Sequence, residues 1–235
     1  MKHVRSLYMW FVGLIYFGII SIIVLLLTFL IHARKLDPLI RWLLNVLFKL
    51  MLIKVEVEGS EKLDKSKTYL LMSNHVNIFD IPLLKAFIPV YFRGVEADYS
   101  FNWPIYGWLI KRLGTIPIKR ENAYSSMRSL RKAKKLLEHG TSIAILPEGH
   151  RTRTGKMQPF KKMPFMLAKD AAVDLVPIGL SGLFSLKQKG SWHLNPTTIK
   201  IKFGDVISSE KIKDMKVEEL RDEMYKRIAA LVERE

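Results

Sequence analysis

The sequence contains no cysteine among its 235 residues. A disulfide framework, a thiolate nucleophile and a cysteine-ligated metal are therefore excluded. The sequence also has no internal repeat, low-complexity tract or glycine-rich linker, so we expect one globular domain beside any membrane segment. Hydrophobic residues make up 49% of the chain, which excludes a disordered protein.

Acidic residues are few beside basic ones, since 22 Asp and Glu oppose 38 Lys and Arg, for a formal net charge of +16. This charge predicts an anionic partner: nucleic acid, a phosphorylated metabolite or an anionic membrane surface. The first 53 residues hold only six Lys and Arg and one Asp. Most of the excess therefore belongs to the remainder of the chain.

Residues 7–31 form an uncharged, mostly apolar run. As a helix about 37 Å long, this run could cross a hydrocarbon core of about 30 Å. It is longer than the apolar region of a secretory signal and no small-residue cleavage site follows it, so we expect it to be retained. More cations follow the run than precede it, which predicts that the remainder of the chain is cytoplasmic.

The next apolar stretch, residues 39–53, carries Arg41, Asn45 and Lys49 at intervals of four, so a helix aligns them in one stripe. Such a stripe favours the membrane interface, although a core helix of the soluble part is the alternative. We expect a two-helix membrane anchor over residues 1–53. Cations on both sides of the first run allow it to cross the bilayer or to dip into one leaflet, and the interfacial second stretch favours dipping.

Strand and helix patterns alternate after residue 53. The predicted strands are residues 55–57, 69–72, 90–92, 115–118, 142–146, 175–179 and 198–203. The predicted helices are residues 81–87, 104–113, 123–139 and 217–232. This alternation predicts an α/β layered domain over residues 54–235, with a central mostly parallel or mixed sheet flanked by helices.

Three loops after predicted strands are rich in polar residues, and in such domains functional groups lie at the carboxyl ends of strands. The first loop begins with Ser73 and Asn74 and contains His75 and Asp80. On a continuous helix His75 and Asp80 would be about 140° apart, so they can meet only if the chain turns between them. A carboxylate that holds one imidazole nitrogen as a donor frees the other nitrogen to accept a proton, which makes a general base. The alternative is that Asp80 caps the following helix.

The second loop starts at Gly114 and ends in Lys119 and Arg120. A basic pair after a strand is usually a solvated surface feature. The helix predicted to follow it adds further cations, which makes the whole neighbourhood strongly basic. These cations are Arg128, Arg131, Lys132, Lys134 and Lys135.

The third loop combines Glu148 and Gly149 with Arg151 and Arg153. Arg151 and Arg153 could clamp a phosphate group through bidentate hydrogen bonds. Glu148 could then orient a substrate hydroxyl or the loop itself. The alternative is that Glu148 is only a structural ion-pair partner among these cations.

In this order, the loops resemble the glycerolipid acyltransferase family, and within it the lysophosphatidic acid acyltransferases. That family carries the blocks Asn-His-x4-Asp, Gly-x-x-x-Ile-x-Arg, Pro-Glu-Gly-Thr-Arg-Ser and a Val-Pro-Ile-type strand. The corresponding blocks here are Asn74-His75…Asp80, Gly114…Ile118-Lys119-Arg120, Pro147-Glu148-Gly149-His150-Arg151-Thr152 and Val176-Pro177-Ile178. The chain departs from the pattern at His150, Thr152 and Met163, where Thr, Ser and Gly are usual, and these departures concern substrate detail more than reaction type.

The resemblance implies a membrane-associated enzyme that moves a fatty acyl group from acyl-CoA or acyl carrier protein to the sn-2 hydroxyl of 1-acyl-sn-glycerol 3-phosphate. It implies that His75 is the general base and that Asp80 fixes its tautomer. The residues implied in substrate binding are Arg120, Arg151, Arg153, Glu148, Gly149 and Gly114. Those implied in orientation are Ser73 and Asn74. No cofactor is implied beyond the thioester co-substrate, and no metal is expected because no His or carboxylate cluster has ligand spacing.

Other acceptors stay open, namely glycerol 3-phosphate, another lysophospholipid or a lyso-aminolipid. A different class is also open: a non-catalytic, membrane-anchored basic module that binds anionic lipid or nucleic acid with strong salt dependence. The acyltransferase interpretation predicts membrane phospholipid, lysophosphatidic acid and a thioester donor as partners, with no nucleic acid. It places the protein at the cell membrane with its catalytic domain on the cytoplasmic side.

Overall fold

The computed structural model describes residues 2–119 and 123–233. Its centre is a seven-stranded sheet in the order β1-β7-β6-β2-β5-β3-β4. The strands are β1 (Lys54–Glu58), β2 (Tyr69–Ser73), β3 (Phe92–Ala97), β4 (Ile116–Ile118), β5 (Ser142–Ile145), β6 (Asp174–Ser181) and β7 (Thr198–Phe203). Neighbouring strands pair in parallel, except that β6 and β7 are antiparallel. The sheet is therefore mixed.

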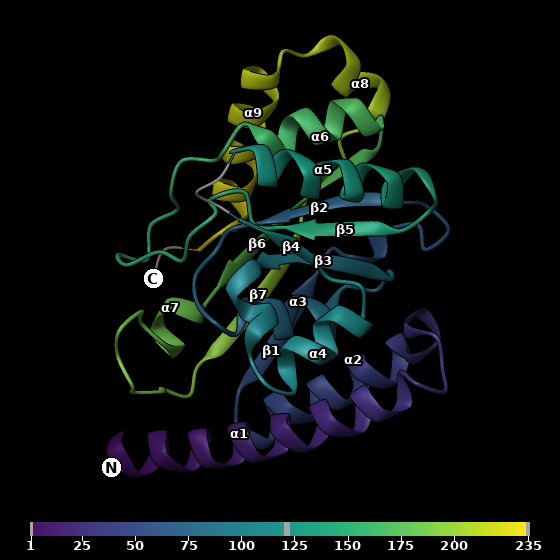
Figure 1. Ribbon diagram of the computed structural model, residues 1–235. Helices are drawn as coiled ribbons and strands as arrows, with labels where there is room; N and C mark the ends of the chain where they lie inside the picture. Colours follow the sequence, from purple (N-terminus) through teal and green to yellow (C-terminus); the bar gives the residue numbers. More distant parts are fainter. Residues whose placement is uncertain (1, 120–122, 234–235) are drawn as a thin grey trace.

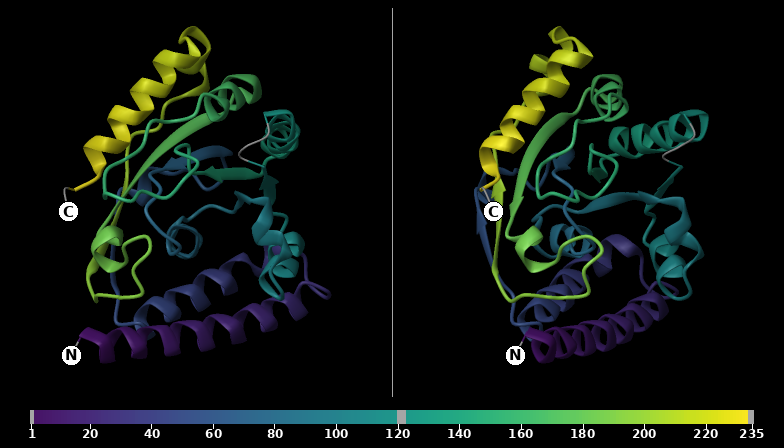
Figure 2. Two further views of the ribbon diagram at one scale, coloured as in Figure 1. Left: turned by 60° about the vertical axis from the view of Figure 1, so that its left-hand side comes forward. Right: turned by 90° about the vertical axis from the view of Figure 1, so that its left-hand side faces the viewer.

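Helices cover both faces of this sheet (Figures 1 and 2). One face carries α5 (Ala123–Glu138), α6 (Met163–Ala171), α8 (Ser209–Asp214) and α9 (Val217–Leu231). The other face carries α1 (Lys2–Leu27), α2 (Ala33–Leu50), α3 (Asp80–Phe87) and α4 (Tyr106–Arg112). A single short helix, α7 (Leu183–Leu186), follows β6, and 3-10 turns occupy Ser60–Lys62 and Asp98–Asn102. The predicted fold class, an α/β layered domain with a mixed sheet, is confirmed.

The central strand β2 shows why the core has two halves. Tyr69 and Leu71 belong to the apolar cluster on the side of α1 to α4, and Leu70 and Met72 to the cluster on the side of α5, α6 and α9. All four side chains are buried. A parallel strand covered on both faces needs apolar residues at every position, so β2 is a continuous apolar run and not an alternating one.

The two N-terminal helices pack along the sheet domain and do not extend away from it (Figure 1). Met9 of α1 and Phe48 of α2 belong to the same buried apolar cluster as Leu83 of α3. The outer side of α1 is also apolar, since Leu7 and Phe11 are 66% and 65% exposed. In the described part of the chain, α1 is the one helix long and apolar enough to cross a membrane. The division expected at residue 53 stays a prediction.

The polar stripe of α2 contacts the protein for most of its length. Arg41 pairs with buried Asp37 at 2.5 Å, and Asp37 also pairs with Lys85 of α3. Asn45 donates a hydrogen bond to the carbonyl oxygen of Ala86 at 3.2 Å. For Arg41 and Asn45 the structure therefore favours the core-helix alternative, because these groups are held against α3 and are not free to reach lipid headgroups.

Several elements differ from the sequence-based expectation, and the short helices α7 and α8 are among those with no predicted counterpart. The strand predicted over residues 90–92 lies further along the chain, as β3, where Arg93 and Glu96 interrupt the apolar pattern and the central side chains are only partly buried. Helix α6 has no predicted counterpart, although Pro164 in its first turn is a common feature of helix starts.

Candidate active site

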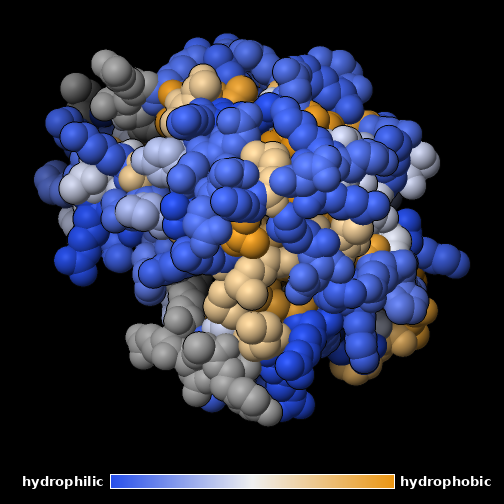
Figure 3. Space-filling view, turned by 90° about the horizontal axis from the view of Figure 1, so that it is seen from above, coloured by the Kyte–Doolittle hydropathy of each residue, from blue (hydrophilic) through white to orange (hydrophobic). Residues whose placement is uncertain are grey.

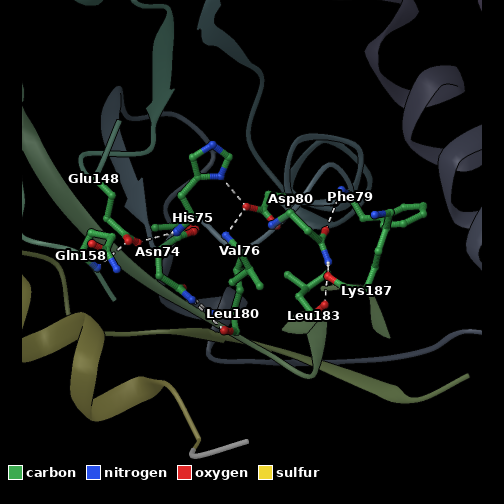
Figure 4. A network of polar contacts seen from close by, with 12 residues as sticks. Asn74, His75, Val76, Phe79, Asp80, Glu148, Gln158, Leu180, Leu183 and Lys187 are labelled. Atoms are coloured by element: carbon green, nitrogen blue, oxygen red, sulfur yellow. Dashed lines mark hydrogen bonds and ion pairs between the residues drawn. The ribbon is translucent and has the colours of Figure 1, made fainter. Parts of the chain in front are cut away.

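His75 and Asp80 face each other beyond the carboxyl end of β2 (Figure 4). The Nδ1 atom of His75 lies 2.7 Å from Oδ2 of Asp80. Oδ2 also accepts a hydrogen bond from the amide of Val76 at 2.6 Å, and Oδ1 accepts one from the amide of Asn77 at 3.0 Å. The carboxylate is fully buried and satisfied by the turn that separates it from His75. The chain does turn between the two residues, and the Asp80 carboxylate binds that turn instead of capping α3.

The second ring nitrogen of His75 remains available. Asp80 accepts a hydrogen bond from Nδ1, which fixes the tautomer with the proton on Nδ1 and a lone pair on Nε2. No described residue forms a hydrogen bond with Nε2, and His75 lines the large pocket of the protein. An imidazole in this state can accept a proton from a group bound in the pocket.

Glu148 fixes the backbone of His75. Its Oε1 atom accepts a hydrogen bond from the His75 amide at 2.7 Å, and Oε2 accepts one from the Gln158 amide at 2.6 Å. The residue is 2% exposed, and burial raises the pKa of its carboxyl from 4.5 to about 7, against the opposing effect of these two hydrogen bonds. The amide of Thr152 donates to the His75 carbonyl oxygen at 3.0 Å. Of the roles considered for Glu148, the structure supports shaping the loop, because both carboxylate oxygens are bound to main-chain amides.

Asn74 and Asn77 attach the turn at residues 74–80 to β6 and to the segment around α7. Asn74 exchanges two hydrogen bonds with the backbone of Leu180, at 2.9 and 2.8 Å. Ser73 is buried at the end of β2, and its hydroxyl donates to the Asn74 carbonyl oxygen at 2.9 Å. Asn77 donates to the carbonyl oxygens of Leu183 and Lys187 at 2.6 and 3.1 Å. The role of Asn77 is missed by the sequence reasoning, although its place inside the Asn-His-x4-Asp block is a signal that could have drawn attention to it.

A pocket of about 700 Å³ opens in front of His75. Part of its lining is apolar and comes from the N-terminal helices, including Trp10, Phe17 and Met51. Another part is cationic and comes from the third loop and the segment that follows it, including Arg151 and Lys161. The volume suits a small-molecule site, and this lining suits a ligand with an apolar portion and an anionic group.

The remaining predicted substrate residues are placed differently from one another. Gly149 lines the pocket with a positive φ of 75°. Gly114 lies outside the lining, at the end of α4 with φ 79°, where an added Cβ would lie 2.7 Å from Cζ of Arg93. This position favours glycine because of its backbone conformation and the packed Arg93 guanidinium, and the substrate-binding role of Gly114 stays a prediction. Arg153 is exposed and also outside the lining, and Arg120 lies outside the described residues.

Three cationic or imidazole side chains in the lining had no predicted role: His150, Lys161 and Lys162. The run Phe160-Lys161-Lys162 after the third loop is the sequence signal that could have indicated the two lysines. Within residues 2–119 and 123–233, no group of three His, Asp or Glu side chains is placed to hold a metal ion.

The mixed sheet, the His-Asp pair beyond its central strand and the partly apolar pocket fit the acyltransferase domain that the sequence blocks suggested. The sequence profile of the acyltransferase family matches residues 54–181. The chain belongs to the acyltransferase family, and the resemblance noted from its sequence blocks is confirmed.

The similar proteins include 1-acyl-sn-glycerol-3-phosphate acyltransferases and an acyltransferase that acts on another lysolipid. The chloroplastic 1-acyl-sn-glycerol-3-phosphate acyltransferase BAT2 of Brassica napus is 31% identical over 179 residues, which cover 75% of this chain and 50% of that protein. The lyso-ornithine lipid O-acyltransferase of Pseudomonas aeruginosa is 32% identical and covers 61% of this chain and 53% of that protein. The chain thus spans about half the length of the curated relatives it matches.

A solved structure extends the likeness to nearly the whole chain. The crystal structure of the 1-acyl-sn-glycerophosphate (LPA) acyltransferase PlsC from Thermotoga maritima superposes with a TM-score of 0.84 and 25% identity. The match covers 97% of this chain and 93% of that one. The N-terminal helices are therefore part of the shared fold.

Proposed function

We propose that the protein transfers a fatty acyl group from an acyl thioester to the sn-2 hydroxyl of 1-acyl-sn-glycerol 3-phosphate, giving phosphatidic acid. The single observation that carries this proposal is the His75 imidazole, held through Nδ1 by Asp80, with Nε2 bound by none of the described residues, on a pocket that combines apolar and cationic linings. The names of the similar proteins from Brassica napus and Thermotoga maritima support the same acceptor.

The chemistry follows from this geometry. Nε2 of His75 accepts the proton of the acceptor hydroxyl as its oxygen attacks the thioester carbonyl carbon, and the Asp80 carboxylate stabilises the imidazolium. The tetrahedral intermediate then expels the thiolate as the new ester forms, and the imidazolium returns the proton to the thiolate sulfur. His75 is thus regenerated without an acyl-enzyme. General-base catalysis of this kind contributes about 10²–10⁴ in rate.

The cationic lining favours a phosphorylated acceptor. Arg151 and Lys161 supply charged donors to the pocket that fit phosphate oxygens. A lyso-ornithine acceptor, suggested by the relative from Pseudomonas aeruginosa, is zwitterionic because it carries a cationic amino group beside its carboxylate, so this lining attracts it less than it attracts a phosphate. Arg120 is proposed as a further phosphate ligand on its position in the second sequence block alone. The donor handle is proposed to be coenzyme A or acyl carrier protein, both of which are anionic.

We also propose that the protein binds one leaflet of the cell membrane through α1, with the pocket on the cytoplasmic side. The outer side of α1 exposes large apolar residues along its length, among them Leu7, Phe11, Leu14 and Leu26. The opposite side of the molecule, seen from above in Figure 3, is mainly hydrophilic. Since α1 packs lengthwise on α2 and α4, an orientation in the plane of the interface exposes its apolar side to lipid without separating it from the domain.

The decisive experiment uses the purified full-length protein in detergent with lysophosphatidate and acyl thioesters. Wild-type protein should form phosphatidic acid, and His75→Ala should lose about 10²–10⁴ in turnover. His139→Ala, which removes an exposed imidazole at the end of α5, is the matched control and should keep full activity. A protein that only bound anionic lipid would show no turnover, and its binding would be the same with His75→Ala.

An acceptor panel tests the substrate class in the same assay. Glycerol 3-phosphate, lysophosphatidylcholine, lyso-ornithine lipid and lysophosphatidate are compared with one donor. The proposal expects the highest kcat/KM for lysophosphatidate. Acylation of another acceptor in its place would contradict the substrate assignment while leaving the acyltransferase chemistry intact.

A further inference from the structure

The loop between α7 and β7 is attached to the first three turns of α1. The Ser6 hydroxyl is fully buried, donates to the Leu194 carbonyl oxygen at 3.2 Å and accepts from the Leu194 amide at 3.0 Å. Nε1 of Trp10 donates to the carbonyl oxygen of Trp192 at 2.6 Å. Figure 2 shows this loop running beside the N-terminal part of α1. These contacts hold residues 188–194 beside the N-terminal part of α1.

The loop presents an indole ring where the apolar side of α1 begins. Trp192 is 47% exposed, and its ring stacks on His3 with 5.4 Å between centroids. The His193 ring lies 4.6 Å from the Trp192 ring. A half-exposed indole beside an apolar helix is typical of the bilayer interface, where the ring sits among headgroups.

Exposed cations belong to the same two segments as this indole and its partner His3. Lys189 of the loop is exposed, as are Lys2 and Arg5 of α1. None of these three forms an ion pair with a residue of the described chain. Lys187 differs, because its ammonium donates to the carbonyl oxygen of Ser191 at 2.7 Å and so shapes the loop. The exposed charges are therefore available to an anionic surface.

We propose that residues 188–193 form a second membrane-contacting element, in which Trp192 enters the headgroup layer and Lys189 binds the phosphates of anionic lipid beside the first turns of α1. This inference rests on the proposed membrane association of α1. An anionic bilayer is the occupant because an apolar helix side, an interfacial indole and unpaired cations meet along one edge. The base of the loop is bonded to the turn at residues 74–80, because Asn77 donates a hydrogen bond to the carbonyl oxygen of Lys187. Binding of the loop to lipid therefore fixes the orientation of the pocket over the bilayer.

The absence of cysteine allows a direct test. Single cysteines are introduced as Lys189→Cys in the loop and Phe11→Cys on the outer side of α1, and each is labelled with an environment-sensitive fluorophore. A third variant, Lys226→Cys, places the label on the exposed surface of α9 as a control. Each labelled full-length protein is mixed with vesicles of phosphatidylcholine and phosphatidylglycerol, and quenching by aqueous iodide is measured.

Protection of the labels at 11 and 189, with the label at 226 still quenched, is the expected result. Protection at 11 with full quenching at 189 would overturn the loop contact and leave the membrane association of α1 standing. Full quenching at all three positions would overturn the loop contact together with that membrane association. Equal protection at 226 would also overturn the loop contact, because binding would not be specific to this edge.

Vesicle binding measures the charge contribution separately. Removing one cation near an anionic surface should weaken partitioning about five-fold, so Lys189→Gln should lose this factor on phosphatidylglycerol vesicles and none on pure phosphatidylcholine. Lys226→Gln should bind as the wild type does. An equal effect of the two substitutions would overturn the assignment of Lys189.

Discussion

The carboxylate of Glu148 accepts a hydrogen bond from the main-chain amide of His75 at 2.7 Å. Glu148 thus holds His75 through its backbone, while Asp80 holds the ring through Nδ1. Two buried carboxylates thus set the position and the tautomer of one imidazole, and the two functions are separable by substitution.

The substitution Asp80→Asn tests the tautomer. An asparagine amide facing Nδ1 donates a hydrogen bond to it and so favours the proton on Nε2, which then cannot accept one from the substrate. We expect kcat to fall by about 10²–10⁴, with the folded state and vesicle binding retained. Asp214→Asn removes an exposed carboxylate of α8 and should leave kcat unchanged. An Asp80→Asn enzyme of normal kcat would show that the pair has no catalytic role.

The raised pKa of Glu148 predicts a pH-dependent stability. Burial raises this pKa from 4.5 to about 7, so the folded state holds the proton more tightly than the unfolded state. The resulting stabilisation is complete below pH 4.5 and is lost as the pH rises through 7. Thermal unfolding in detergent should show the Tm of the wild type falling relative to Glu148→Gln across this window. Glu138→Gln, at an exposed site on α5, should show no such relative change, and a constant difference for Glu148→Gln would contradict the prediction.

Arg151 should contribute to acceptor binding. A charge-assisted hydrogen bond contributes about 1.5–3 kcal/mol, so Arg151→Ala should raise the KM for lysophosphatidate about tenfold or more, with a smaller effect on kcat. Arg153 lies two residues away, exposed and outside the pocket lining, and Arg153→Ala should leave this KM unchanged. Steady-state kinetics with varied acceptor distinguish the two, and equal effects would contradict the assignment.

Gly114 is expected to affect stability and not substrate binding. Gly114→Ala places a methyl group at a positive φ and against the Arg93 guanidinium, so Tm should fall. Gly190→Ala is the matched control, because Gly190 has a φ of 89° but no atom within 4 Å of an added Cβ. Gly114→Ala should lower the Tm further than Gly190→Ala, with the same KM for the acceptor as the wild type. A raised KM with normal Tm would support the substrate-binding role expected from the sequence.

The sequence predicts those parts of the site that depend on side-chain identity and short spacing. The His75 and Asp80 pair follows from its turn, and β2 follows from an apolar run that parallel strands require. The partners of Glu148 could not be predicted, because it binds main-chain amides that any residue supplies. The position of β3 could not be predicted, because Arg93 and Glu96 break the apolar pattern in a strand whose central side chains are only partly buried. The polar stripe of α2 could not be placed from the sequence either. Its pattern predicts a membrane interface, but Asn45 donates a hydrogen bond to the carbonyl oxygen of Ala86.

The shared apolar cluster of α1, α2 and α3 has a practical consequence for anyone who wishes to obtain a water-soluble fragment. Cutting the chain before β1 would strip one wall from the pocket, uncover Leu83 and leave the Lys85 ammonium without Asp37. Such a fragment should aggregate instead of yielding a simpler catalyst. Helices α1 and α2 are therefore part of the structural core of the protein, and a more soluble variant is better sought by redesign of the outer side of α1 alone.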